Sequence, residues 1–131
     1  MNAFIVGRAA ISYTALVFAA GIVLGTIRIL VVAPRWGDLP AVLLESPIML
    51  FVSWLACGIS VRLSNVRGAR AGLAMGVTAF VLLMTAELVL SVLAFGRSPT
   101  EFDAAYSTRA GAVGLMGQVA FGLMPLFRSA R

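Results

Sequence analysis

The chain has 131 residues, of which 61% are hydrophobic and only 11% are charged. Because soluble domains carry about 25% charged residues, this composition excludes an ordinary soluble globular protein. The net charge of +5 comes from arginine alone, and we expect these arginines to contact lipid head groups at helix ends and not to bind nucleic acid.

Four apolar stretches each approach the length of about 20 residues that a helix needs to cross a membrane. The sequence predicts helices over about 9–33, 41–63, 71–95 and 110–127, in a single membrane domain covering 1–131. Pro34 should end the first helix, because proline lacks an amide hydrogen and disfavours helical geometry at the residue before it. A turn is therefore expected over 34–37.

The second helix should begin after Asp38, a suitable N-cap, and should kink at Pro47. A short basic connection follows over 64–70, and 96–109 is the longest polar stretch. Within that stretch, Ser98-Pro99-Thr100-Glu101 is a suitable start for a short interfacial helix. The predicted fold is an all-α, integral membrane four-helix up-and-down bundle.

Charge asymmetry predicts the orientation of this bundle. Three regions, the N-terminus, the connection at 64–70 and the C-terminus, share one side and carry no acidic residue; their arginines are Arg8, Arg62, Arg67, Arg70, Arg128 and Arg131. The other side has a net charge of zero, from Arg35, Arg97 and Arg109 against Asp38, Glu101 and Asp103. Because arginine is enriched on the cytoplasmic side of membrane proteins, both termini are predicted to be cytoplasmic.

Each predicted helix places one strong polar side chain inside the membrane. At about 1.5 Å per residue, all four lie roughly 8–12 Å below the outer helix ends; they are Arg28, Glu45, Glu87 and Gln118. Helical periodicity puts each on the small-residue face of its helix, which is the face that packs against other membrane helices. The sequence therefore predicts an intramembrane polar cluster, with Arg35 at its rim.

This cluster permits a functional and a structural interpretation. Arg28 can pair with Glu45 or Glu87, which leaves one carboxylate free to carry a proton or bind a cation. Alternatively, all four side chains form a satisfied network that fixes helix register. With no histidine and only Cys57 as a thiol, the sequence predicts no metal site, no cofactor and no disulfide within the chain.

Several short motifs resemble those of an uncharacterised family of small four-helix bacterial inner-membrane proteins. They are Gly25-Thr26-Ile27-Arg28, Pro34-Arg35, Glu45-Ser46-Pro47-Ile48-Met49, Ala86-Glu87-Leu88, Gly96-Arg97-Ser98 and Gly122-Leu123-Met124-Pro125-Leu126. The chain departs from the family pattern at Phe102, near which related sequences carry a tyrosine. The resemblance implies a multi-pass protein of the bacterial inner membrane, and it implies no activity, substrate or cofactor.

Three functions are compatible with these features. The first is an accessory or structural membrane protein, or a subunit of a larger complex, whose partners are the bilayer and another membrane protein or a second copy. The second is a small proton- or ion-coupled transporter that uses Glu45 or Glu87. The third, an intramembrane enzyme, would depend for acid–base chemistry on two glutamates alone, so we expect a protein that is not an enzyme.

Overall fold

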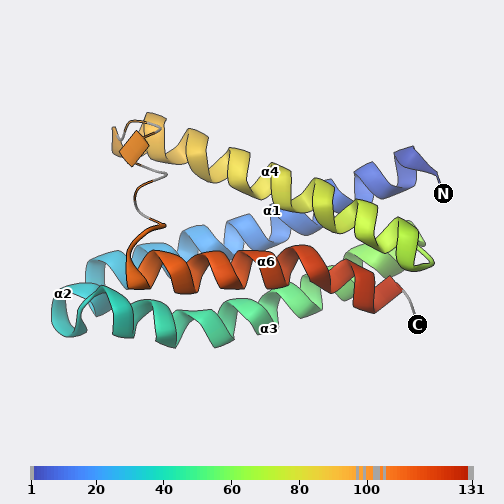
Figure 1. The fold of residues 1–131 in the computed structure, drawn as a ribbon. Coiled ribbons are helices and arrows are strands. Elements are labelled where there is room, and N and C mark those ends of the chain that lie inside the picture. The colour runs from blue at the N-terminus through green and yellow to red at the C-terminus, as the bar shows by residue number, and fades with distance from the viewer. Residues whose placement is uncertain (1, 97, 99, 102–103, 105, 130–131) are drawn as a thin grey trace.

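The computed structural model describes residues 2–96, 98, 100–101, 104 and 106–129. Within these residues the chain is helical and contains no strand. The elements are α1 (Ala3–Ile27), the π-helix η1 (Arg28–Val32), α2 (Ala33–Trp36), α3 (Asp38–Ser64), α4 (Ala69–Phe95) and α6 (Arg109–Ser129) (Figure 1). Four segments are long and apolar enough to cross a membrane, namely Ala3–Trp36, Asp38–Ser64, Ala69–Ala94 and Gly111–Ser129.

The first helix is longer at both ends than the sequence predicted. It begins at Ala3 because the side chain of Asn2 caps it, accepting bonds from the amides of Phe4 and Ile5. Pro34 does not end it, so the predicted turn over 34–37 is wrong. One π-helical turn lets the amide of Ala33 donate to the carbonyl of Arg28, and the helix then continues to Trp36.

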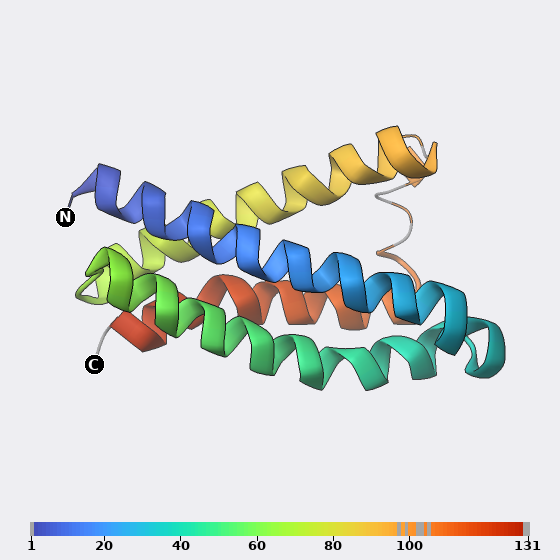
Figure 2. The same ribbon diagram turned by 180° about the vertical axis from the view of Figure 1, so that it is seen from behind.

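The connection to α3 is reduced to Gly37, whose φ of 92° lies in the left-handed region that favours glycine. Gly37 is the N-cap of α3, so the expectation that Asp38 caps this helix is also wrong. Asp38 is instead the first helical residue, where its negative charge stabilises the helix by interacting with the positive end of the helix dipole. The helix continues through Pro47 to Ser64 and bends along its length (Figure 2).

The remaining boundaries lie close to the predicted ones. α4 begins at Ala69 and ends at Phe95, and α6 continues through Pro125 to Ser129. In the connection between them, the amide of Glu101 donates to Ser98 Oγ at 3.1 Å, and 100–101 is helical. This agrees with a helix start at Ser98, although part of that segment (97, 99, 102–103 and 105) lies outside the described residues.

The four long helices lie side by side and alternate in direction. α1 packs against α3 and α4, and α6 packs against the same two helices. α3 and α4 are consecutive in the sequence but lie on opposite sides, with α1 and α6 between them (Figures 1 and 2). Both termini and the connection between α3 and α4 are at one end of the molecule, and α2 is at the other (Figure 1).

The centre of the molecule is organised around Tyr13, which is 0% exposed. Its ring stacks on that of Phe121 with 4.2 Å between centroids, and its hydroxyl donates to the Phe121 carbonyl at 2.7 Å. That carbonyl lacks its usual helical donor, because the residue four positions later is Pro125. Tyr13 therefore joins α1 to α6 and satisfies a backbone group that the proline leaves free.

Glycine allows α4 and α6 to approach closely. A Cβ atom at Gly76 would collide with the backbone carbonyl of Gly122, and one at Gly72 would collide with Ser129 Oγ. Small residues of this kind are typical of contacts between membrane helices. Large apolar side chains point outward instead; Leu30, Phe51, Leu63 and Leu93 are each more than 60% exposed, which suits a surface that faces lipid.

We predict that Gly76→Ala destabilises the protein by about 1–3 kcal/mol, because the added methyl group must push α4 away from the backbone of α6. Thermal unfolding in lipid nanodiscs would measure the effect. Gly114→Ala is the matched control, since nothing lies within 4 Å of its Cβ position. Equal unfolding temperatures for the two variants would contradict close packing at Gly76.

Candidate functional site

The predicted intramembrane polar cluster begins with an ion pair between the first two membrane segments. Arg28 is the first residue of η1, and Glu45 lies two turns into α3. Arg28 Nε and Glu45 Oε2 are 3.0 Å apart, with side chains 33% and 16% exposed. Neither atom has a hydrogen-bond partner, so the contact is an ion pair whose geometry does not make a hydrogen bond.

A second group of polar side chains joins α4, α6 and the segment between them. Gln118 Nε2 donates to Glu87 Oε2, and the hydroxyl of Tyr106 donates to the same oxygen at 3.2 Å. Gln118 Nε2 and the Tyr106 oxygen are themselves 3.4 Å apart. The Glu87 carboxylate is therefore held by two neutral donors and by no arginine among the described residues.

The structure thus divides the four predicted residues into two pairs, Arg28 with Glu45 and Glu87 with Gln118. The pairs are neighbours, because Arg28 and Glu45 both act electrostatically on Glu87. Arg35 lies in α2 and is exposed, and it forms no ion pair with any described residue. Its position at the rim of the cluster stays a prediction.

Tyr106 is a member of the cluster that the sequence reasoning missed. It lies in the polar connection before α6, outside the four predicted helices. A tyrosine next to a membrane segment is a usable signal, since its apolar ring and polar tip suit the membrane interface. Burial, and then the charge of Glu87, raise the pKa of Tyr106 to about 12, so its hydroxyl remains a donor at neutral pH.

The arrangement can hold a proton or a small cation more readily than it can perform covalent chemistry. Gln118 Oε1 is buried without a hydrogen-bond partner, although the adjacent Nε2 is bonded to Glu87. Within the described ranges, no three histidine, cysteine, aspartate or glutamate side chains form a group that could hold a metal ion. The contacts present at Glu87 are the hydrogen bonds that its carboxylate accepts from Gln118 and Tyr106.

Comparisons with protein-family models, with curated proteins and with solved structures found no match to this chain. The geometry of the two pairs is therefore the basis for any functional assignment.

The Tyr106 hydroxyl should ionise near pH 12 and not near 10, because burial and the Glu87 charge both oppose a phenolate there. Phenolate absorbance at 295 nm, taken as the difference between wild type and Tyr106→Phe, would isolate this titration. The folded-state pKa is raised, so the stabilisation is fully present below about pH 10 and is lost between about pH 10 and 12. A midpoint at the ordinary tyrosine value would refute the contact with Glu87.

Breaking the ion pair should cost more than removing both partners. Arg28→Met leaves the Glu45 carboxylate unpaired in a mostly buried position, and we expect a loss of about 2–3 kcal/mol, somewhat below the value for fully buried pairs. The double variant Arg28→Met/Glu45→Leu should recover most of this loss, because it leaves no charge behind. Additive losses in thermal unfolding would show that the two side chains do not interact.

Proposed function

We propose that this protein is a non-enzymatic accessory or structural protein of the bacterial inner membrane, acting as a subunit beside another membrane protein or a second copy of itself. Four apolar helices of membrane-spanning length support the membrane assignment. The bacterial inner membrane is the location that the sequence resemblance implies.

The proposed topology is a four-helix bundle with both termini in the cytoplasm. The side-by-side packing of the helices supports the bundle. The position of both termini and the α3–α4 connection at one end supports the topology (Figure 1), because six of the ten arginines belong to these three regions. An arginine-rich end is the end that remains in the cytoplasm.

The accessory assignment depends mainly on one observation, which is that the three charged groups of the polar cluster each contact a polar or charged side chain of the same chain. Arg28 neutralises Glu45, and Glu87 accepts bonds from Gln118 and Tyr106. Each pair links two membrane segments near the same end: Arg28 and Glu45 join η1 to α3, and Glu87 and Gln118 join α4 to α6. These contacts favour one arrangement of the helices, although Arg28 Nε, Glu45 Oε2 and Gln118 Oε1 make no hydrogen bond. The exposed apolar side chains on the outer faces remain available for a partner.

The alternative is a small proton- or cation-coupled transporter that uses Glu87. The observation in its favour is that Glu87 has no arginine in contact among the described residues, while Gln118 Oε1 beside it lacks a hydrogen-bond partner. A carboxylate with neutral neighbours can take up and release a proton without breaking an ion pair. Intramembrane acids also commonly mark ion pathways.

Glu87→Gln separates the two functions. For an accessory protein we expect a loss of about 1 kcal/mol in unfolding free energy, because a neutral amide accepts weaker hydrogen bonds than a carboxylate does. Proteoliposomes with a trapped pH dye should show the same proton leak for wild type, Glu87→Gln and empty vesicles. The exposed residue Glu101 supplies the control variant Glu101→Gln. A wild-type flux that disappears in Glu87→Gln while the unfolding temperature is kept would overturn the accessory assignment in favour of transport.

A further inference from the structure

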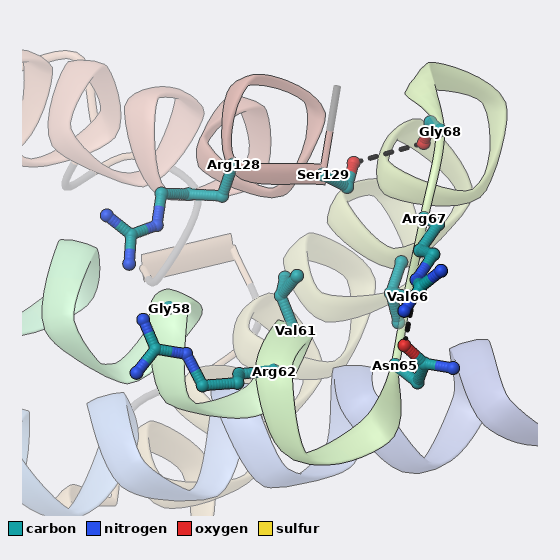
Figure 3. A pocket seen from close by; sticks show the side chains of 9 residues that line it. All are labelled: Gly58, Val61, Arg62, Asn65, Val66, Arg67, Gly68, Arg128 and Ser129. Atoms are coloured by element: carbon teal, nitrogen blue, oxygen red, sulfur yellow. Dashed lines mark hydrogen bonds between the residues drawn. The ribbon is translucent and has the colours of Figure 1, made fainter. Parts of the chain in front are cut away.

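A basic depression lies at the opposite end of the molecule from the polar cluster. It has a volume of about 640 Å³ and is formed by the last turns of α3 and α6 and the connection that leads into α4. Its lining residues are Gly58, Val61, Arg62, Asn65, Val66, Arg67, Gly68, Arg128 and Ser129 (Figure 3). Three of these nine residues are arginines, and none is acidic.

Two of the arginines in this depression extend their guanidinium groups to the same side. Arg62 extends from α3 and Arg128 from α6, and their guanidinium groups point in the same direction, toward the side of Gly58 (Figure 3). Gly58 makes this placement feasible, because a Cβ atom there would collide with the guanidinium of Arg128. Arg67 points the other way and donates to Asn65 Oδ1 at 2.9 Å (Figure 3).

The position of Arg128 is fixed before any ligand binds. Its guanidinium carbon lies 4.4 Å from the ring centroid of Trp54, within the range of a cation–π contact. The end of α6 is anchored nearby: Ser129 Oγ donates to the Gly68 carbonyl at 3.1 Å, and the Gly68 amide donates to the Ser129 carbonyl at 2.9 Å. Less side-chain freedom is therefore lost when an anion binds.

The charge of Arg62 and Arg128 is not neutralised within the described part of the chain. The described ion pair is the one between Arg28 and Glu45, near the other end. None of the four described acidic side chains lies at this end: Asp38 begins α3, Glu45 and Glu87 belong to the polar cluster, and Glu101 lies between α4 and α6. Two guanidinium groups on one face repel each other, and an anion between them would remove that repulsion.

From these contacts we infer that Arg62 and Arg128 form a binding site for a phosphate-bearing anion, at the level where lipid head groups meet the arginine-rich helix ends. Guanidinium groups match phosphate oxygens in geometry and charge. Basic pockets between membrane helices on the cytoplasmic side bind anionic head groups. The inference rests on the proposed topology, with this end at the cytoplasmic face, and it is independent of the accessory or transport function.

The test compares two double variants of equal charge in the full-length protein. Arg62→Gln/Arg128→Gln removes the site, whereas Arg8→Gln/Arg70→Gln removes two arginines that do not line the depression. Both would be placed in phosphatidylcholine nanodiscs with increasing phosphatidylglycerol, and lipid retained by the protein would be counted by native mass spectrometry. Circular dichroism would verify that both variants keep their helix content.

We expect wild type and the Arg8/Arg70 variant to retain phosphatidylglycerol selectively, and the Arg62/Arg128 variant to bind it at least about five-fold more weakly. Competition by millimolar inorganic phosphate in the buffer, with the same dependence on Arg62 and Arg128, would identify free phosphate as the preferred source of the anion. Equal retention by the two double variants would overturn the inference, because the attraction would then depend on net charge alone.

Discussion

The interior depends on the hydrogen bond between the Tyr13 hydroxyl and the carbonyl of Phe121. A membrane offers no water to a backbone group that has lost its partner, so the carbonyl freed by Pro125 must find a donor within the protein. Tyr13 supplies it from α1, and the stacked rings fill the space between the helices. Pro125 thereby sets the contact between α1 and α6. Pro34 is accommodated differently, by the π-helical turn whose first residue, Arg28, pairs with Glu45.

The sequence predicted the four long helices well because hydrophobicity over about 20 residues is a direct physical requirement for crossing a membrane. Four apolar helices follow from the lengths of the apolar stretches, and their identification is confirmed. The polar residues were placed on contact-forming faces by helical periodicity, and the structure does bring Arg28 to Glu45 and Glu87 to Gln118. What periodicity cannot specify is which helix is the neighbour of which, so the choice of partner for Arg28 stayed open.

The errors were local and share a cause. Pro34 and Asp38 were interpreted by rules for isolated helices, in which proline ends a helix and aspartate caps one. A π-helical turn and the left-handed Gly37 satisfy the same backbone requirements with fewer residues in the turn. Tyr13 lies in the middle of an apolar stretch, where no sequence pattern marks it, and its role follows only from the fold that brings it to the Phe121 carbonyl. Tyr106 lies beside a membrane segment, which suggests an interfacial position, but its acceptor on α4 is again set by the fold.

The opposite positions of α3 and α4 have a consequence for the order in which the protein is built. Helices leave the ribosome in sequence order, so α4 is made directly after α3. These two helices do not pack against each other along their length, because α1 and α6 lie between them. The glycine face of α4 and the Tyr13 hydroxyl both have their partners on α6. Before α6 is added, the three preceding helices therefore have an incomplete interior. Only α6 supplies the partners of these groups, so a chain that ended before α6 would leave the Tyr13 hydroxyl and the glycine face of α4 uncovered.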